Sequence, residues 1–377
     1  MLKMIFLFFK KRITFLNYLL FFKEKKMTLF FIGLGINGCK YLTLKGLEAL
    51  KNSNKIFLDV YTSKISKEDI KELSKLISKE IIIANREILE NEVLKIIEEA
   101  KDKNIAILIP GDPFIATTHI SIKELALEKN IKIETINGVS IVSAAISLSG
   151  LSTYRFGRIV TIPKTNNIEH LRQPYQEILE NSLRGLHTLS LLDTKNGGLS
   201  INDALKNLME FEEIYGENFL KKDMLIMAFE RIGYEDSRII VKKIEEHINE
   251  KYEKFPQCMI FLGELQFNEK EILKKIFNLS NEYIEKHQYE DIRKKRSRIY
   301  IQKLENVFKQ IESRKDKIIN EKILKIIEYA YNYYEDAKYF YDKGDYQTSL
   351  ISSSYSEGLL DSLRMLNLIE FSWESIS

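Results

Sequence analysis

The sequence predicts two α/β domains followed by an all-helical segment. Apolar, strand-like runs alternate with helical patterns from Met27 onward, and a second alternation of the same kind follows the turn at Asn137-Gly138. From about residue 283 to the end, the patterns are helical throughout. The first alternation favours a mostly parallel sheet covered by helices on both faces. A length of 377 residues is enough for two or three domains.

The first domain is predicted over 27–137. Short runs rich in β-branched and aromatic residues indicate buried strands, and longer runs with apolar residues three or four apart indicate helices. The expected strands are 28–33, 55–60, 80–84, 105–109 and 131–136, and the expected helices are 43–51, 67–78, 88–101 and 118–129.

The second domain is predicted over 138–282 from the same two kinds of run. A helix over 269–287 is expected to close this half of the chain. The expected strands are 158–162, 187–192, 223–229, 237–241 and 257–262, and the other expected helices are 139–148, 173–184 and 201–215.

A helical domain is predicted over 283–377, with helices at 285–313, 318–343 and 346–366. Lys343-Gly344-Asp345 indicates a helix stop followed by a new N-cap. An aromatic stripe at helical spacing, which includes Tyr329, Tyr333 and Tyr334, is interpreted as core packing. The basic run 293–298 is typical of a solvated helix face, and it could alternatively contact RNA or an acidic partner surface.

The first 26 residues differ from the rest of the chain. They are rich in Phe, Leu and Lys, and Lys10-Lys11-Arg12 splits their apolar stretch. Neither half reaches the roughly 20 apolar residues that cross a bilayer. We interpret Met1–Lys26 as a dispensable tail or a mis-assigned start. A signal peptide and a membrane-surface helix are the alternatives.

Composition narrows the classes of function. A net charge of +3 gives no global signature of nucleic-acid binding. Cys39 and Cys258 are the only cysteines and form no CxxC pair, so neither a disulfide framework nor a zinc site is indicated. The five histidines are scattered, without an HxxxH pair. We therefore expect a protein of the reducing cytoplasm, with no metal and no membrane association.

The run from Pro110 to His119 is the strongest candidate for a binding loop. It follows the apolar run 105–109, so it places an acidic Gly-Asp-Pro turn at the carboxyl end of a predicted strand. Open α/β sheets bind their ligands at this edge. An ordinary Pro-Gly turn is the alternative interpretation.

A second candidate lies at Gly33–Gly38, which matches the pattern GxGxxG after a predicted strand. With Asp59 about 20 residues later, the pattern suggests a dinucleotide-binding unit with a pyrophosphate at a helix N-terminus. However, Thr43 is a plausible N-cap, which would start the helix later than that motif requires. The motif alone therefore leaves dinucleotide binding open.

Several strings together resemble the diphthine synthases, a branch of the tetrapyrrole-methylase-like S-adenosylmethionine methyltransferases. They occur in family order between residue 27 and about residue 275. The PGDPxxATTH string is particular to this branch. The matching strings are Phe31-Ile32-Gly33-Leu34-Gly35, Leu42 to Glu48, Tyr61-Thr62-Ser63, Pro110 to His119, Gly138 to Ile141, Arg184 to Leu189 and Leu192-Asp193.

The resemblance implies two α/β domains of the tetrapyrrole methylase type, with the active site in the cleft between them. It implies S-adenosyl-L-methionine as cofactor and no metal, and it leaves the catalytic residues unknown. Glu230 and Cys258 depart from the small residue and the histidine that the family favours there. The cofactor contacts carried over are Ile36, Asp112, Ile115, Ser140, Ile141, Leu192, Glu230 and Cys258.

The resemblance also implies a reaction. Methyl groups would be transferred in succession to the amino group of the amino-carboxypropyl-modified histidine of translation elongation factor 2, forming diphthine. A cytoplasmic homodimer is implied. The alternatives are a methylase of the same fold that acts on a tetrapyrrole precursor, and a non-catalytic, cofactor-binding interaction protein. The C-terminal segment resembles a small archaeal helical domain of unknown function, for which we expect an interaction role.

Overall fold

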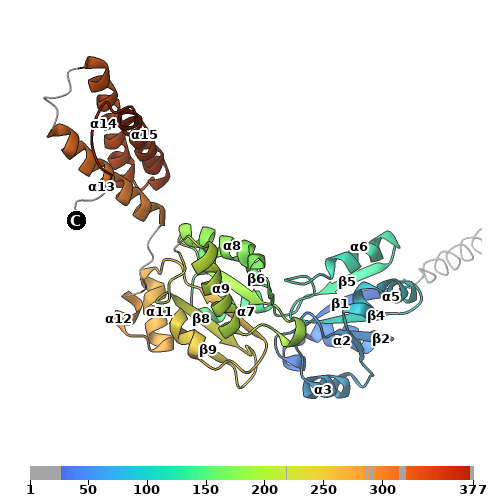
Figure 1. Ribbon diagram of the computed structural model, residues 1–377. Coiled ribbons are helices and arrows are strands. Elements are labelled where there is room, and N and C mark those ends of the chain that lie inside the picture. The colour runs from blue at the N-terminus through green and yellow to red at the C-terminus, as the bar shows by residue number, and fades with distance from the viewer. Residues whose placement is uncertain (1–26, 218, 286, 288–291, 314–319, 374–377) are drawn as a thin grey trace, which may run out of the picture.

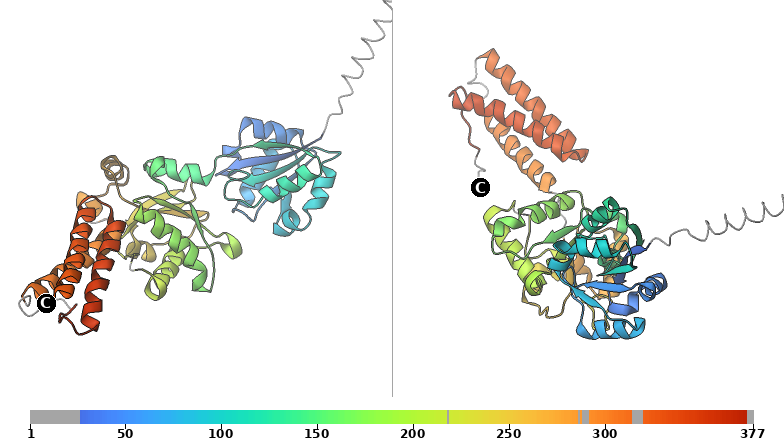
Figure 2. Two further views of the ribbon diagram at one scale, coloured as in Figure 1. Left: turned by 90° about the horizontal axis from the view of Figure 1, so that it is seen from above. Right: turned by 90° about the vertical axis from the view of Figure 1, so that its right-hand side faces the viewer.

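The chain forms three units that follow one another along the molecule in the computed structural model (Figures 1 and 2). The structure describes residues 27–217, 219–285, 287, 292–313 and 320–373. The prediction for Met1–Lys26 lies outside these residues. Two units are built on sheets and the third is a helical bundle beside the second sheet unit. The domain boundaries expected near residues 137 and 282 stay predictions.

The first unit is a five-stranded parallel sheet in the order β3-β2-β4-β1-β5. Helices connect successive strands, as the alternation predicted. The elements are β1 (Thr28–Gly35), α2 (Leu44–Asn52), β2 (Lys55–Asp59), α3 (Lys67–Ile77), β3 (Ile82–Ala84), α4 (Arg86–Glu90), α5 (Val93–Glu99), β4 (Ile105–Pro110), α6 (Ile120–Glu128) and β5 (Lys132–Ile136).

Both faces of this sheet are covered, because its central strands carry buried apolar side chains that point to either face. Leu29 and Phe31 of β1 pack with α4, α5 and α6 on one face. Ile32 and Leu34 of the same strand pack with α2 and α3 on the other face. One expected helix, 88–101, is instead the two short helices α4 and α5, separated at Asn91-Glu92.

The second unit is also a five-stranded sheet, but its strands are mixed in direction. The order is β6-β7-β10-β8-β9, in which β10 runs antiparallel to both of its neighbours and β6 runs parallel to β7. Its elements are α7 (Ile141–Ser149), β6 (Val160–Ile162), α8 (Arg172–Leu183), β7 (Thr188–Leu192), α9 (Ile201–Tyr215), β8 (Leu225–Glu230), β9 (Arg238–Lys243), α10 (Ile244–Asn249), β10 (Gln257–Phe261), α11 (Phe267–Phe277) and α12 (Asn281–Glu285).

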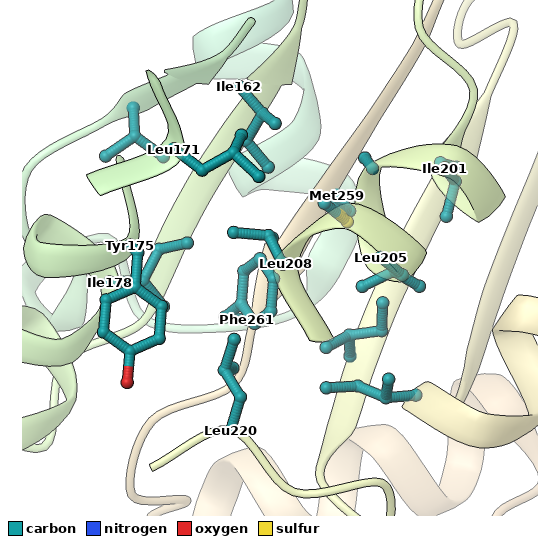
Figure 3. Close-up of a cluster of buried hydrophobic side chains, with 14 of the residues drawn as sticks. Ile162, Leu171, Tyr175, Ile178, Ile201, Leu205, Leu208, Leu220, Met259 and Phe261 are labelled. Carbon is teal, nitrogen blue, oxygen red and sulfur yellow. The ribbon is translucent and has the colours of Figure 1, made fainter. Parts of the chain in front are cut away.

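Helices cover both faces of this sheet as well. On one face, Met259 and Phe261 pack with Tyr175 of α8 and Leu205 of α9 (Figure 3). On the other face, α7, α11 and α12 pack against β7, β8, β9 and β10. The helix expected over 269–287 is divided into α11 and α12, because Asn278 adopts a left-handed conformation that ends α11.

The described residues of the third unit form three helices: α13 (Ile292–Glu312), α14 (Glu321–Asp342) and α15 (Tyr346–Met365). The expected stop before α15 is confirmed, because the Asp345 side chain accepts the Thr348 N–H at 3.1 Å. Among the aromatic residues expected in the core, Tyr334 is buried. The expectation was wrong for Tyr329 and Tyr333, which are exposed on α14.

The basic run at the start of α13 joins the helical unit to the second sheet unit. Arg293 donates a hydrogen bond to the Leu183 carbonyl at the end of α8. Arg296 forms an ion pair with Glu217 at 3.3 Å. The run is therefore partly an intramolecular contact and not only a solvated face. Within the described part of the chain, no helix combines the length and apolar character needed to span a membrane.

Candidate functional site

A cavity of about 730 Å³ lies between the two sheets and is lined by both. The first unit contributes the loops that follow β1, β2 and β4. The second unit contributes the start of α7 and residues of β7, β8 and β10. The carboxyl ends of the parallel strands in the first sheet thus form one side of the cavity, as expected for an open α/β sheet.

Three glycines allow the backbone segments to meet beneath this cavity. A Cβ atom on Gly33 would lie 2.4 Å from the Gly138 nitrogen, and one on Gly138 would lie 2.2 Å from the Gly111 carbonyl oxygen. No side chain can be accommodated at such distances. The ends of β1, β4 and β5 are therefore held in direct backbone contact by residues from three of the matching strings.

The loop after β4 is fixed by hydrogen bonds at both of its edges. Gly35 and Gly111 exchange backbone hydrogen bonds of 3.0 and 2.8 Å. Asp112 is buried, and its carboxylate accepts the Phe114 N–H at 3.0 Å and the Asn137 side-chain amide at 3.0 Å. The acidic turn is therefore an ordered part of the cavity, not merely a reversal of the chain.

Asp59 holds the facing loop and does not reach the cavity. It is fully buried, and its Oδ1 accepts the backbone N–H groups of Tyr61 and Thr62, at 2.8 and 3.2 Å. The Thr62 hydroxyl donates to its Oδ2. Because this carboxylate is fully buried and is not among the residues that line the cavity, a ribose bound there would not reach it. The role that the dinucleotide-binding alternative gives to Asp59 is therefore excluded.

The helix after GxGxxG also begins too late for pyrophosphate binding. α2 starts at Leu44, and the Thr43 hydroxyl accepts the Gly46 N–H as its N-cap. A short 3₁₀ turn, Gly38–Tyr41, separates this helix from the glycines. The expected N-cap at Thr43 is confirmed, and the glycines serve the backbone contacts described above.

The second unit provides an apolar wall. Phe229, Ile232 and Cys258 line the cavity and belong to the same buried cluster as Ile36 and Ile141. Burial raises the pKa of the Cys258 thiol to about 12, so it is uncharged at neutral pH. Ser140 adds a polar edge as the N-cap of α7, where its hydroxyl accepts the Val142 N–H at 3.2 Å.

Seven of the eight residues carried over as cofactor contacts line this cavity: Ile36, Asp112, Ile115, Ser140, Ile141, Leu192 and Cys258. Glu230 is not among the lining residues. Its carboxylate accepts the Lys254 N–H at 2.7 Å and pairs with Arg238 at 3.2 Å. Side chains alternate along a strand, so Phe229 faces the cavity and Glu230 faces the opposite side of β8.

Other lining residues were not carried over, although the matching strings contain several of them. Tyr61 and Thr118 lie on opposite loops, and their hydroxyls are hydrogen bonded at 3.0 Å. Lys64, Arg86 and Lys195 also line the cavity, and nothing in the sequence pattern singled them out. His119, the last residue of the Pro110–His119 run, is fully buried with its Nε2 at 3.3 Å from Asp59 Oδ2.

Direct contacts close the two units around the cavity. The Asn37 side-chain amide donates to the Gly233 carbonyl at 2.7 Å, and the Thr194 hydroxyl donates to the Tyr61 carbonyl at 3.0 Å. These bonds cross from one sheet unit to the other at the residues that line or adjoin the cavity. The site is therefore composite, because neither sheet unit forms it alone.

Comparison with known proteins agrees with this arrangement. A model of the tetrapyrrole (corrin/porphyrin) methylases matches residues 28–247, more than half of the chain. The chain belongs to the tetrapyrrole methylase family. A further model, for a protein family of unknown function, matches residues 299–369 of the helical unit.

The relatives of this methylase include diphthine synthases. One from Methanococcus aeolicus is 37% identical over 247 residues, which cover 64% of this chain and 95% of the relative. A probable diphthine methyl ester synthase from Arabidopsis thaliana is 32% identical over 268 residues, covering 65% and 96%. The resemblance found in the sequence is thereby confirmed, and the chain is an enzyme of the methyltransferase class.

Solved structures agree with the fold of the methylase. A crystal structure of diphthine synthase matches with a TM-score of 0.62 and 31% identity, covering 68% of this chain and 98% of that one. A putative diphthine synthase from Entamoeba histolytica matches with a TM-score of 0.60 and 28% identity, covering 67% and 100%. The predicted class, two α/β units with a helical segment, is confirmed.

Proposed function

We propose that this methylase uses S-adenosyl-L-methionine to methylate, in succession, the amino group of the amino-carboxypropyl-modified histidine of translation elongation factor 2, forming diphthine. Its similarity to diphthine synthases along nearly their whole length supports the reaction. The observation that carries the proposal is the cavity, because seven predicted cofactor contacts from five separate segments of the chain line it together.

The residues present fit this cofactor. The cavity volume lies within the usual range for small-molecule sites, and such sites combine apolar walls with a few polar groups. Phe229, Ile232 and Cys258 offer an apolar surface for an adenine ring. Asp112 and Ser140 offer polar groups at the opposite edge. Glu230 can contribute to this site only through its main chain or by supporting its neighbours.

The proposed chemistry needs positioning more than acid–base assistance. The cofactor supplies an electrophilic methyl group, so a carbon–nitrogen bond forms as the carbon–sulfur bond breaks toward sulfur, and a proton then leaves the new ammonium to solvent. The protein must hold a neutral amine in line for attack, which is mainly a proximity effect. Asp112, with both oxygens held by N–H donors, orients the cofactor and is not a general base.

The wider assignments belong to the same proposal. Elongation factor 2 is the protein substrate, and the enzyme works in the cytoplasm as a homodimer. The helical unit has an interaction role, with protein or RNA as its weak partner. The contacts of Arg293 and Arg296 place this helical unit beside the second sheet unit.

A transfer assay with labelled cofactor tests the proposal. The full chain is incubated with elongation factor 2 that carries the amino-carboxypropyl group, and separately with the same factor lacking it. We expect label only in the first protein. Label on a porphyrin precursor instead would support the alternative methylase. Cofactor binding without label on any of these would favour a non-catalytic role.

A further inference from the structure

In the described part of the chain, three cationic side chains and two carboxylates line the cavity. Lys64, Arg86 and Lys195, here called the basic rim, are the lysines and arginines among the described residues that line it. Asp112 and Asp193 are the lining carboxylates. Asp112 is held by Phe114 and Asn137, and Asp193 accepts the backbone N–H groups of Lys195 and Lys164, at 2.9 and 3.2 Å.

Lys195 is the member of the basic rim that is available to a ligand. Arg86 is paired with Glu90 at 2.8 Å. Lys64 donates to the Gly197 carbonyl and lies 3.9 Å above the Phe255 ring. Among the described residues, none pairs with the Lys195 ammonium, and the side chain is exposed. Its backbone is fixed nonetheless, because it opens the 3₁₀ turn Lys195–Gly197 and its N–H binds Asp193.

We infer that Lys195 binds the carboxylate of the substrate's amino-carboxypropyl group, because it is the cation of the basic rim that no described residue already pairs. This inference rests on the proposed function, which gives the substrate a carboxylate close to the reacting amine. The lysine ammonium is a compact charge on a flexible methylene chain, so it can form an ion pair with a carboxylate that is carried into the cavity by another protein. The exposed position of Lys195 puts it where such a group can enter the cavity.

The same contact serves the chemistry. Anchoring the carboxylate restricts where the amine of the same short side chain can lie, so the amine is brought toward the reacting methyl group. Positive charge near an amine disfavours its protonated form. The basic rim thus favours the neutral amine that attack requires, and it does so without a general base.

The test replaces Lys195 by Met, which keeps the stem and removes the charge, and by Arg, which keeps the charge. Modified elongation factor 2 is the substrate, and KM, kcat and the Kd of S-adenosylmethionine are measured. We expect Lys195→Met to raise the KM for the protein substrate about tenfold or more, as for loss of a charge-assisted hydrogen bond. Cofactor affinity should stay unchanged, and Lys195→Arg should restore most of the loss.

Lys206→Met is the matched control, because Lys206 is an exposed lysine on α9 outside the cavity. Unchanged KM in Lys195→Met, with an active wild-type enzyme, would overturn the inference and leave the proposed function standing. Weaker cofactor binding at unchanged substrate KM would assign the contact to the cofactor's carboxylate and also overturn it. An inactive wild-type enzyme that binds the cofactor would overturn the proposed function, and the inference with it.

Discussion

The two sheet units shape one cavity by different means. The first unit depends on close backbone contact, because Gly33 and Gly111 meet Gly138 at distances that exclude any side chain. The second unit contributes mainly side chains, such as Phe229 and Cys258, which form the apolar wall. Replacing one of these glycines even by alanine would separate the backbone segments, whereas a wall of apolar side chains tolerates substitutions that conserve side-chain volume. The first unit should therefore be far less tolerant of mutation at the site.

The largest effect is expected from adding one methyl group to the glycine contact. Gly138→Ala places a Cβ 2.2 Å from the Gly111 carbonyl oxygen, and backbone on both sides cannot move aside. We expect a loss of stability above about 3 kcal/mol, beyond the usual cost of overpacking, together with loss of cofactor binding. Thermal unfolding and calorimetry measure the two effects.

Gly358→Ala is the control for this substitution. Gly358 lies inside α15, and a Cβ there meets open space. Alanine in a helix interior should be stabilising by about 0.5–1 kcal/mol relative to glycine. If Gly138→Ala unfolds at the wild-type temperature, the first unit does not depend on its backbone contacts as we describe.

The second unit should be the more sensitive to acid. Burial lowers the pKa of His247 to about 4, against a usual value of 6.5, and the ring is hydrogen bonded to Tyr252 and the Ile226 carbonyl. The unfolded chain therefore binds more protons between pH 6.5 and pH 4, so stability falls as pH falls through this window. The loss approaches about 3 kcal/mol at pH 4.

A carboxylate extends this loss to lower pH. Burial alone would raise the pKa of Glu269, but hydrogen bonds from His187 and from the N–H groups of Gln266 and Ser152 lower it to about 2. The contribution of Glu269 to stability is present above pH 4.5 and is lost as pH falls toward 2.

Hydrogen exchange followed by mass spectrometry, corrected for intrinsic rates, should show the second sheet opening first as the pH is lowered. Earlier opening of the first sheet would contradict this order.

A smaller effect is expected at the acidic turn. Asp112→Ala removes the acceptor of the Phe114 and Asn137 hydrogen bonds and a polar group of the cavity. We expect cofactor affinity to fall about tenfold, equivalent to about 1.4 kcal/mol, and more than the rate of the chemical step. Calorimetry and single-turnover kinetics separate the two quantities. Unchanged affinity in this variant would refute the orienting role of Asp112.

The smallest effect concerns the two cysteines. Cys258 is buried with a pKa raised to about 12, whereas Cys39 is partly exposed, although burial raises its pKa as well. Alkylation at neutral pH should therefore modify Cys39 before Cys258, and Cys258 should react only after unfolding. Peptide mass spectrometry identifies the site. Rapid labelling of Cys258 in the native enzyme would show that the apolar wall opens to solvent.

Local chemistry made much of the fold predictable. Thr43 and Asp345 are caps whose side chains accept N–H groups as expected, and central strands such as β4 and β8 are nearly continuous apolar runs. The divided helices were missed because nothing in periodicity marks the short interruption at Asn91-Glu92, or the left-handed Asn278. Exposure of Tyr329 was missed because a stripe of aromatic residues does not reveal which neighbours cover it.

The site was less predictable because many separate segments of both sheet units form it. Family strings led to Asp112 and Ser140, but no single string indicates that β8 turns Glu230 away from the cavity. The alternation along that strand could have separated Phe229 from Glu230. Lys195 lies just after a matching string. Whether its ammonium is free to bind a ligand depends on whether nearby carboxylates such as Asp193 already accept backbone N–H groups. Such information exists only in three dimensions.

The most direct test of the account is intact and peptide mass spectrometry of elongation factor 2 that bears the amino-carboxypropyl histidine, after incubation with the full chain and S-adenosylmethionine. The account predicts mass steps of one methyl group each, localised to that histidine, and their number counts the transfers. No change in mass, with cofactor binding confirmed in parallel, would contradict the account.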